Sequence, residues 1–485
     1  MSLSSTMSFT VGSTARFGPR AGTVILLRAG ISLSIDTPAP MVATSRGVIA
    51  HLGRDQYKRM PLQCISLPFE SFLEASPPIP TLQPNSNNPL HTLLGFTPGH
   101  NALVLTLRDP SNSNETPANG NDYVSASTGR GMKKVTPAQW TEYAHACAPD
   151  LVVALPDIPW TPPPFSQKRV TKSIERTANW LAKLLAPTPL PLNVLVHMAG
   201  GISEPARRAF TDSLTETLYG KEAEAIHPHK CLDDGVVGYV FDLVPLGKAM
   251  EASADGARDE QENIVAFLRA SLSSARTPKL RIVNSAESPH QILRLIRDVG
   301  VDVFDVKWAQ DAAQFGVALD FVFPLPKPAA EGNKQRDLGH NLFHTQYAHD
   351  FSRFADFLPG CPCLACAPVG AREVILHSAI DAHTPDANGI PPYTRAYVHH
   401  LLHTHEMSSH SLLLMHNLAV LDAFFTGVRG VLQGGENFAA HVDRFAAAYD
   451  ERLTVVHEAR TMWKDVDLAR GKGRLARERA AGESM

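Results

Sequence analysis

The chain has 485 residues, of which 44% are hydrophobic and 19% are charged, and its formal net charge is −3 at pH 7. The composition is close to globular averages. The slightly negative net charge excludes nucleic-acid binding through an overall basic surface, so any contact with RNA would have to use a local basic patch. A chain of this length can bury a large core, as one large α/β domain with attachments or as two to three domains.

The sequence shows neither a membrane span nor a signal-peptide core, and the Ser/Thr content and single early Arg of its first residues indicate a transit peptide only weakly. No apolar run approaches the length of a bilayer span, and the first residues, MSLSSTMSFTVGSTARFG, lack the apolar core of a signal peptide. Three of the six cysteines are clustered, which is typical of a reducing compartment and a metal site rather than of disulfides.

Short apolar runs alternate with amphipathic stretches along the chain. The predicted strands lie within residues 22–30, 101–109, 150–158, 192–200, 235–244, 279–286 and 301–308. The predicted helices lie within residues 136–148, 172–186, 203–220, 261–275 and 288–300, several with a capping Ser, Thr or Glu near the start. This alternation indicates a parallel sheet covered on both faces, and the number of units favours a closed (β/α)8 TIM barrel over an open sheet. The absence of a glycine-rich phosphate fingerprint after the first strand also weighs against a dinucleotide fold.

Turn-rich segments interrupt this pattern. They cover residues 76–89, 109–122, 251–263 and 326–337, and a further segment, 367–392, separates the clustered cysteines from later histidines. Their Pro, Asn, Gly and charged residues predict surface insertions rather than core elements.

Three aspartates stand at the ends of predicted strands. Asp157, Asp242 and Asp305 each follow or end an apolar run. Chemistry in a (β/α)8 barrel lies at the carboxyl ends of the strands, so these carboxylates are candidates for base recognition or nucleophilic attack. Capping of the next helix and ion pairing are equally open interpretations of each residue.

The motif CPCLAC places Cys361, Cys363 and Cys366 within six residues, and the apolar segment that follows carries His416. Three thiolates and one imidazole form a complete tetrahedral shell with no open position for water, which predicts one structural zinc ion per chain. The spacing does not single out one histidine, and three free buried thiols are the interpretation without a metal. The competing histidines are His399, His400, His403, His405 and His410.

Over most of its length the chain resembles the tRNA-guanine transglycosylase (queuine tRNA-ribosyltransferase) family. The matching stretches are STARFGPRAGTV, IDTPAPMVATSRGVIAHL, VTPAQWTEYAHACAPDLVVALPDIP, KSIERTANWL, GVDVFDVKW, CPCLAC and TRAYVHHLLHTHEMSSHSLLLMHNL. The resemblance implies that Asp157 matches a purine-recognising aspartate and that Asp305 matches the nucleophile. The register from Arg395 leads to a histidine-asparagine pair, which selects His416 as the fourth zinc ligand.

The departures from the family pattern concern the catalytic residues. Ser127 stands where catalytic members carry the aspartate of an Asp-Ser-Gly-Gly-Phe-Gln motif after the second barrel strand, and a serine cannot serve as a carboxylate base at neutral pH. Tyr239 follows Gly238 where a second glycine is expected, so its ring is predicted to intrude into the base pocket. The arginine-rich loop after the strand of Asp305 is replaced by WAQDAAQFGVALDFVFP. These departures are those of the family's non-catalytic accessory subunits, so no residue is predicted to be catalytic.

The resemblance thus implies an accessory subunit of a heterodimer that exchanges guanine for queuine at the tRNA wobble position. Its implied partners are a catalytic queuine tRNA-ribosyltransferase subunit and tRNA, with a homodimer as the state of the chain alone. The implied location is the cytoplasm, with peripheral association with the mitochondrial outer membrane as a second option. The expected domains are a barrel over 8–345, an inserted zinc-binding subdomain over 346–430 and a C-terminal helical segment over 431–485.

The zinc subdomain is expected to form the dimer contact around residues 393–430. The basic tail at 463–482 is expected either to touch phosphates or to form a solvated helix. Two other functions stay open at this point. One is an active transglycosylase whose catalytic carboxylate has moved to Asp122 or Asp242, and the other is a zinc-stabilised barrel or scaffold unrelated to tRNA.

Overall fold

The computed structural model describes residues 6–13, 15–28, 30–82, 87–161, 163–252, 259–275, 278–326, 335–356, 361–367 and 392–467. The chain divides into two compact units. The first unit comprises residues 1–50, 62–307 and 429–438, and the second comprises 51–61, 308–428 and 439–485. The expected insertion at 367–392 and the basic tail at 463–482 fall largely outside the described residues, as do parts of the insertions at 76–89, 251–263 and 326–337.

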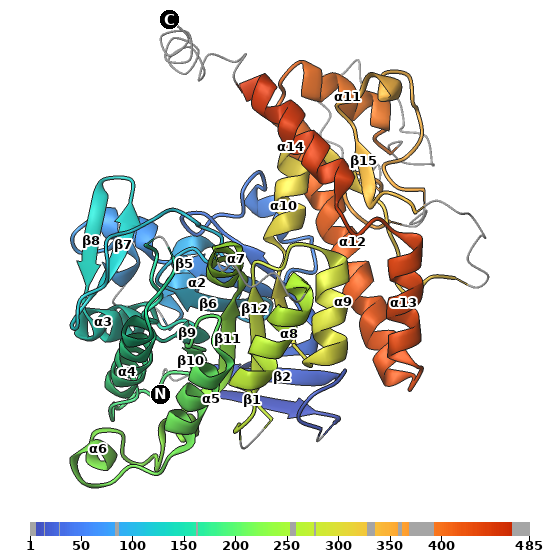
Figure 1. The fold of residues 1–485 in the computed structure, drawn as a ribbon. Helices are drawn as coiled ribbons and strands as arrows, with labels where there is room; N and C mark the ends of the chain where they lie inside the picture. The colour runs from blue at the N-terminus through green and yellow to red at the C-terminus, as the bar shows by residue number, and fades with distance from the viewer. Residues whose placement is uncertain are drawn as a thin grey trace, which may run out of the picture. The chain divides into compact units, whose positions relative to one another are not determined.

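The first unit contains a closed barrel of eight strands in the order β10-β11-β12-β13-β4-β5-β6-β9 (Figure 1). The strands are β4 (Ala39–Ala43), β5 (Cys64–Pro68), β6 (Ala102–Thr106), β9 (Leu151–Val153), β10 (Val194–His197), β11 (Val236–Asp242), β12 (Leu280–Asn284) and β13 (Val303–Asp305). Every neighbouring pair is parallel, and β13 closes the ring by pairing with β4. The predicted (β/α)8 barrel is therefore confirmed.

The connections of this unit carry the helices. They are α2 (Pro89–Leu94), α3 (Pro137–Cys147), α4 (Gln167–Leu184), α5 (Glu204–Thr215), α6 (Gly220–Ala225), α7 (Leu243–Glu251), α8 (Glu260–Ser271) and α9 (Pro289–Asp298), with short 3₁₀ turns η1 (Glu70–Glu74), η2 (Ile79–Leu82) and η3 (Leu232–Gly235). Thr136, Ser166, Ser203 and Ser288 cap α3, α4, α5 and α9, because each side chain accepts a hydrogen bond from a backbone N–H of the first turn. A hairpin of β7 (Val124–Thr128) and β8 (Gly131–Val135) follows β6.

The N-terminal part differs from the sequence-based expectation. Residues 22–30 were expected among the parallel strands, but they contain β2 (Gly22–Arg28) of an antiparallel sheet with β1 (Thr6–Val11) and β3 (Ile31–Thr37). The first two barrel strands are instead β4 and β5, whose sequences APMVA and CISLP were not predicted. Both are only five residues long and contain proline, so their strand pattern in the sequence is weak.

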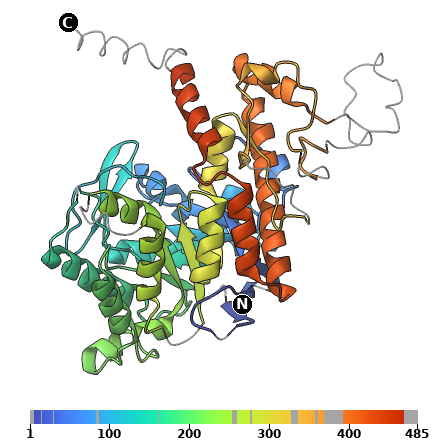
Figure 2. The ribbon, with the colours of Figure 1, turned by 45° about the vertical axis from the view of Figure 1, so that its right-hand side comes forward.

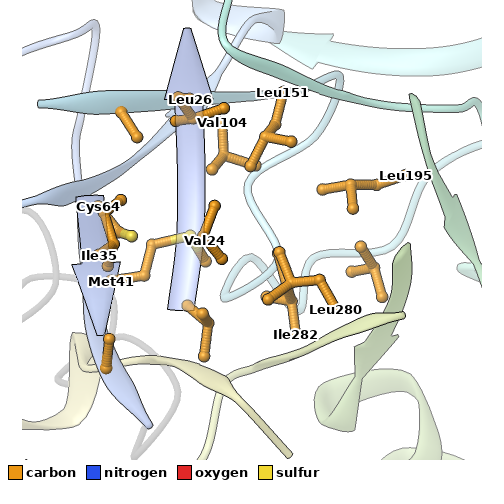
Figure 3. Close-up of a cluster of buried hydrophobic side chains, with 14 of the residues drawn as sticks. Val24, Leu26, Ile35, Met41, Cys64, Val104, Leu151, Leu195, Leu280 and Ile282 are labelled. Atoms are coloured by element: carbon orange, nitrogen blue, oxygen red, sulfur yellow. The ribbon is translucent and has the colours of Figure 1, made fainter. Parts of the chain in front are cut away.

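The barrel interior is filled by apolar side chains that alternate with outward-facing residues along each strand. Figure 3 shows Met41, Cys64, Leu151 and Leu280 together with Val24, Leu26 and Ile35 of the β1–β3 sheet. Cys64, Leu151 and Leu280 are the first residues of their strands. The β1–β3 sheet therefore packs on the N-terminal end of the barrel, and the opposite end, where the strands finish, is left for polar residues.

The second unit consists of helices around a two-stranded sheet. Its elements, assigned by where most of their residues lie, are α1 (Arg54–Tyr57), α10 (Lys307–Gln314), β14 (Val317–Leu319), β15 (Gly339–Asn341), η4 (Thr345–Tyr347), α11 (Arg395–His403), α12 (Ser408–Gln433), α13 (Phe438–Ala448) and α14 (Thr454–Asp467). Phe424 of α12 and Phe445 of α13 lie beside each other, with ring centroids 6.2 Å apart, as the course of the two helices in Figures 1 and 2 also shows. The longest segment of this unit starts at Trp308, upstream of the expected subdomain start at 346, and β14 within it is hydrogen-bonded to α12.

Among the described residues, α12 is long and apolar enough by length and composition to cross a membrane, with a mean hydropathy of 1.5 in its most apolar window. The sequence reasoning had found no such run, because His410, His416 and Asn417 interrupt the apolar residues. In the structure 72% of the most apolar window of α12 is buried, as in a core helix of a globular protein.

Candidate metal centre and barrel mouth

The second unit brings the three clustered cysteines and His416 together. The Nδ1 atom of His416 lies 3.6 Å from the sulfur of Cys361, 3.9 Å from that of Cys363 and 3.4 Å from that of Cys366. All four side chains are buried, and their ligand atoms lie within 4.8 Å of one another. The four residues selected in the sequence therefore form one compact Cys3His cluster.

These distances fit a bound metal ion. In a tetrahedral zinc site with Zn–S bonds of about 2.3 Å and Zn–N bonds of about 2.0 Å, sulfur and nitrogen are about 3.5 Å apart. The imidazole is also oriented for this role, because its Nε2 lies 2.9 Å from the carbonyl oxygen of Leu319 and donates a hydrogen bond to it. That bond leaves the lone pair on Nδ1, facing the sulfurs. The cluster can thus hold a metal ion such as zinc.

Asn417 fixes the helix that carries His416. Its side-chain oxygen accepts a hydrogen bond from the backbone N–H of Leu319 at 2.9 Å, and its amide donates to the carbonyl oxygens of Ala309 and Val317 at 3.2 and 3.0 Å. Neighbouring residues of α12 therefore provide the metal ligand and the bonds that position it on β14. The sequence showed the histidine-asparagine pair but not this positioning role of the asparagine.

Three of the competing histidines have other contacts. His399 and His403 make hydrogen bonds to the carbonyl oxygens of Leu342 and Phe343, and the ring of His410 lies against Trp463. Within the described part of the chain, one further cluster has a geometry that could hold a metal, formed by Asp320, His340 and Asp356. The guanidinium of Arg395 lies 3.0 Å from His340 Nε2 and 2.9 Å from Asp356 Oδ1, so a cation already occupies this cluster.

The three strand-end aspartates lie at the C-terminal face of the barrel, as expected. Asp157 is 1% exposed, and both of its carboxylate oxygens are engaged. Arg169 forms a bidentate pair with it at 2.8 and 2.9 Å, Arg176 approaches to 3.1 Å, and the amide of Asn119 donates at 2.8 Å. A carboxylate with two arginines and an amide has no acceptor position left for a purine. The sequence did not reveal these partners, because Asn119 lies in a turn-rich insertion and both arginines lie on α4.

Asp305 is buried at the end of β13. Its two carboxylate oxygens accept hydrogen bonds from the backbone N–H groups of Lys307 at 2.7 Å and Ser285 at 3.0 Å. Burial raises the pKa of this carboxyl group to about 6, and the two backbone hydrogen bonds offset part of that effect. The nucleophile-like aspartate is therefore retained, but both oxygens support the adjoining backbone.

The raised pKa predicts how stability depends on pH. Between about pH 4 and 6 the folded chain holds the Asp305 proton more tightly than the unfolded chain, so this contribution to the free energy of unfolding decreases as the pH rises. The total is about 3 kcal/mol, of which about 1 kcal/mol falls between pH 5 and 7. Chemical denaturation of the chain and of Asp305→Asn at both pH values measures it. The variant should lose less stability over this interval, and parallel curves would contradict the prediction.

Ser127 lies on β7 of the β7–β8 hairpin. This hairpin follows β6, which is the third barrel strand in chain order and not the second as the sequence had suggested. The backbone N–H of Ser127 donates a hydrogen bond to the carboxylate of Glu70 at 3.2 Å. Glu70 also accepts from the backbone N–H of Asp109 at 3.1 Å, and burial raises the pKa of Glu70. Glu70 is thus a buried carboxylate of η1 that ties the hairpin to this turn.

The expectation that Tyr239 enters the base pocket is wrong. Side chains alternate along β11, and Val240 points into the barrel core, so Tyr239 points outward. Its hydroxyl donates a hydrogen bond to Asp233 at 2.7 Å, and its ring is 1% exposed. Gly238 is on the inward side, where an added Cβ would lie 2.5 Å from the carbonyl oxygen of Leu280.

The two candidates for a relocated carboxylate differ in their surroundings. Asp122 is exposed in the turn before β7. Asp242 ends β11, where it accepts a hydrogen bond from the Asn284 amide at 2.7 Å and lies 3.1 Å from Nε2 of His197. The sequence reasoning missed His197, although its place at the end of the apolar run before Met198 was the available signal.

A (β/α)8 barrel with an attached Cys3His metal cluster defines the class of this protein. The family model described as queuine tRNA-ribosyltransferase matches residues 17–451. This chain therefore belongs to the queuine tRNA-ribosyltransferase family.

Curated relatives resemble the chain over nearly its whole length. It is 28% identical over 436 residues to a protein of Drosophila grimshawi named queuine tRNA-ribosyltransferase accessory subunit 2, covering 87% of this chain and 88% of the relative. Relatives with the same name in Schizosaccharomyces pombe and Anopheles gambiae are 26% and 27% identical, covering 87% of this chain and 80% and 86% of the relatives.

Proposed function

We propose that this chain is the non-catalytic accessory subunit of a heterodimeric queuine tRNA-ribosyltransferase that exchanges guanine for queuine at the tRNA wobble position. The observation that carries the proposal is the set of contacts around Asp157. Its carboxylate is paired with Arg169 and Arg176, and all of its hydrogen-bond acceptor positions are used. The names of the curated relatives point to the same role.

Base exchange needs a displaced base held in a pocket and a carboxylate that attacks the ribose C1′. In this chain Asp157 cannot accept hydrogen bonds from a purine, and Ser127 supplies no carboxylate. Asp305 alone, with both oxygens bonded to backbone N–H groups, does not make a catalytic set. The chemistry therefore falls to a catalytic subunit, and this chain supplies a dimer surface and contacts to tRNA.

The metal ion in this proposal is zinc, one per chain, with Cys361, Cys363, Cys366 and His416 as ligands. Three thiolates select a soft ion, and four protein ligands leave no position for a reactive water, so the ion stabilises the fold and takes no part in chemistry. A cytoplasmic location, with or without attachment to the mitochondrial outer membrane, and a homodimer in the absence of the partner complete the proposal.

Residues 393–430 were expected at the dimer contact, and within this range the two phenylalanines of α12 are not available. Phe424 and Phe425 are 1% and 0% exposed, so changing them to aspartate would disrupt the core rather than test an interface. Two exposed aromatic side chains of this unit lie near the start of α11. Phe351 is 76% exposed and Tyr397 is 44% exposed, and Tyr397 stacks on Tyr393 with ring centroids 5.5 Å apart. Exposed aromatic residues are the usual anchors of protein interfaces.

We expect the double variant Phe351→Asp with Tyr397→Asp to bind the catalytic subunit at least about 30-fold more weakly, because interface anchors contribute about 2 kcal/mol or more. The variant should keep its metal and its melting temperature, since both side chains are exposed. Titration of labelled partner with the purified chain measures the affinity. Tyr219→Asp, at an equally exposed position of the first unit, is the matched control. Unchanged affinity of the double variant would place the interface elsewhere.

Exchange of labelled guanine into tRNA tests the function itself. The purified chain should show no exchange alone, whereas addition of a catalytic queuine tRNA-ribosyltransferase subunit should give an active complex of defined size. Exchange by the chain alone would favour the relocated carboxylate. Failure to bind tRNA or any catalytic subunit would favour a scaffold unrelated to tRNA.

A further inference from the structure

A pocket of about 230 Å3 opens at the carboxyl ends of β9, β10 and β11 in the first unit. Its wall is mainly apolar and includes Phe165, Met198, Ile202, Phe241, Pro245 and Leu246. One water molecule occupies about 30 Å3 of liquid, so the pocket has room for about eight waters or for a bicyclic ring system. Pockets with apolar walls and few convergent polar groups are typical small-molecule sites.

Most polar groups of this wall already have partners within the chain. Asp157 is saturated by its two arginines and Asn119, and Arg207 donates from Nε to the carbonyl oxygen of Gly201 and from Nη1 to the hydroxyl of Ser271. These groups therefore shape the pocket but offer little to a ligand.

His197 differs from the other polar groups of the wall. It is 6% exposed and lines the pocket from the end of β10, and neither ring nitrogen has an aligned hydrogen-bond partner. Its Nε2 lies 3.1 Å from Oδ2 of Asp242, while Oδ1 of Asp242 accepts from Asn284. The attraction of the carboxylate favours the proton on Nε2, which leaves the lone pair of Nδ1 without a donor. A buried polar atom without a partner is rare in proteins and costly to leave unsatisfied.

We propose that this pocket binds a small, uncharged, mainly apolar molecule about as large as a bicyclic heteroaromatic ring, which donates one hydrogen bond to Nδ1 of His197. The apolar wall buries the body of the ligand, and His197, positioned by Asp242, recognises its N–H or O–H group. Guanine does not fit this description, because its several N–H groups need acceptors and the Asp157 carboxylate is occupied. This site is separate from the proposed tRNA role of the subunit.

Indole and 1-methylindole test the proposal, because they share an aromatic body and differ in one N–H donor. Binding to the full, metal-loaded chain is measured by ligand-observed NMR titration, without partner or tRNA, so the result does not depend on the proposed function. Indole should bind at one site, and 1-methylindole about tenfold more weakly, since it would leave Nδ1 unsatisfied. Equal affinities, or no binding of either compound, would overturn the proposal.

Variants locate the site. His197→Leu should abolish the preference for indole, whereas His145→Leu, the same exchange on α3 away from the pocket, should preserve it. Ala249→Phe, at another position of the wall, should fill the pocket and remove binding of both compounds, and a cooperative unfolding transition with retained metal checks that this variant is folded. Binding retained in Ala249→Phe would place indole elsewhere and overturn the assignment. Binding of guanine that is lost in His197→Leu would overturn the ligand class.

Discussion

Replacing His416 by alanine is expected to release the metal ion and to lower the melting temperature by an amount on the order of 10 °C. Structural zinc sites contribute about 10–16 kcal/mol of binding free energy that is coupled to folding. At about 2–4 °C per kcal/mol, the loss of a third of this contribution already gives a shift of that size. The Nδ1 atom of His416 lies within 3.9 Å of all three sulfurs. A small movement of the cysteines cannot supply a fourth ligand in its place.

Metal content per chain by atomic emission, together with thermal unfolding, measures this effect. His400→Ala is the matched control, because His400 is an exposed histidine on α11 and was one of the candidate ligands in the sequence. The control should retain one metal ion and its melting temperature. Full metal content and unchanged unfolding of His416→Ala would mean that another histidine is the ligand. Cys363→Ser should behave like His416→Ala, since it removes a thiolate from the same shell.

The parts of this protein that follow from local sequence pattern could be predicted. Alternating apolar runs and capped helices indicated the barrel, because parallel strands buried on both faces need continuous apolar sequence. The CPCLAC motif indicated the metal site, because thiolate spacing is a local property of the chain. The choice of His416 needed more than spacing, since five other histidines lie within 20 residues, and it came from the resemblance to family members.

The parts that depend on contacts distant in sequence could not be predicted. The partners of Asp157 come from the insertion at Asn119 and from α4, and only folding places them around one carboxylate. The direction of Tyr239 depends on which residues of β11 face the barrel axis, and a shift of one residue reverses that choice. The unpartnered His197 is recognised only when its neighbours at the strand ends are known.

Asp305, at the end of β13, keeps the aspartate of the family's nucleophile position. Asp305→Asn in this chain is expected to leave guanine exchange by the heterodimer unchanged within about twofold. The same replacement of the nucleophile in the catalytic subunit is expected to lower exchange by about 10⁴-fold or more, as for other nucleophiles that act within a catalytic unit. The two subunits are expected to differ because this chain has no acid–base carboxylate at position 127 and no free base-recognition carboxylate at position 157. Asp305 therefore has no catalytic partners.

Initial rates with labelled guanine measure the effect in complexes that carry one altered subunit at a time. Thermal unfolding of each complex is the control, because the asparagine changes one of two backbone hydrogen bonds that Asp305 accepts and so acts on stability. Denaturing gels of complexes quenched during exchange show which subunit holds tRNA covalently. An adduct on this chain that disappears in Asp305→Asn, or a hundredfold loss of exchange in a complex with unchanged unfolding, would make Asp305 a nucleophile. The Asp305 carboxylate would then act in catalysis and not only in support of the backbone, and the non-catalytic accessory role would have to be abandoned.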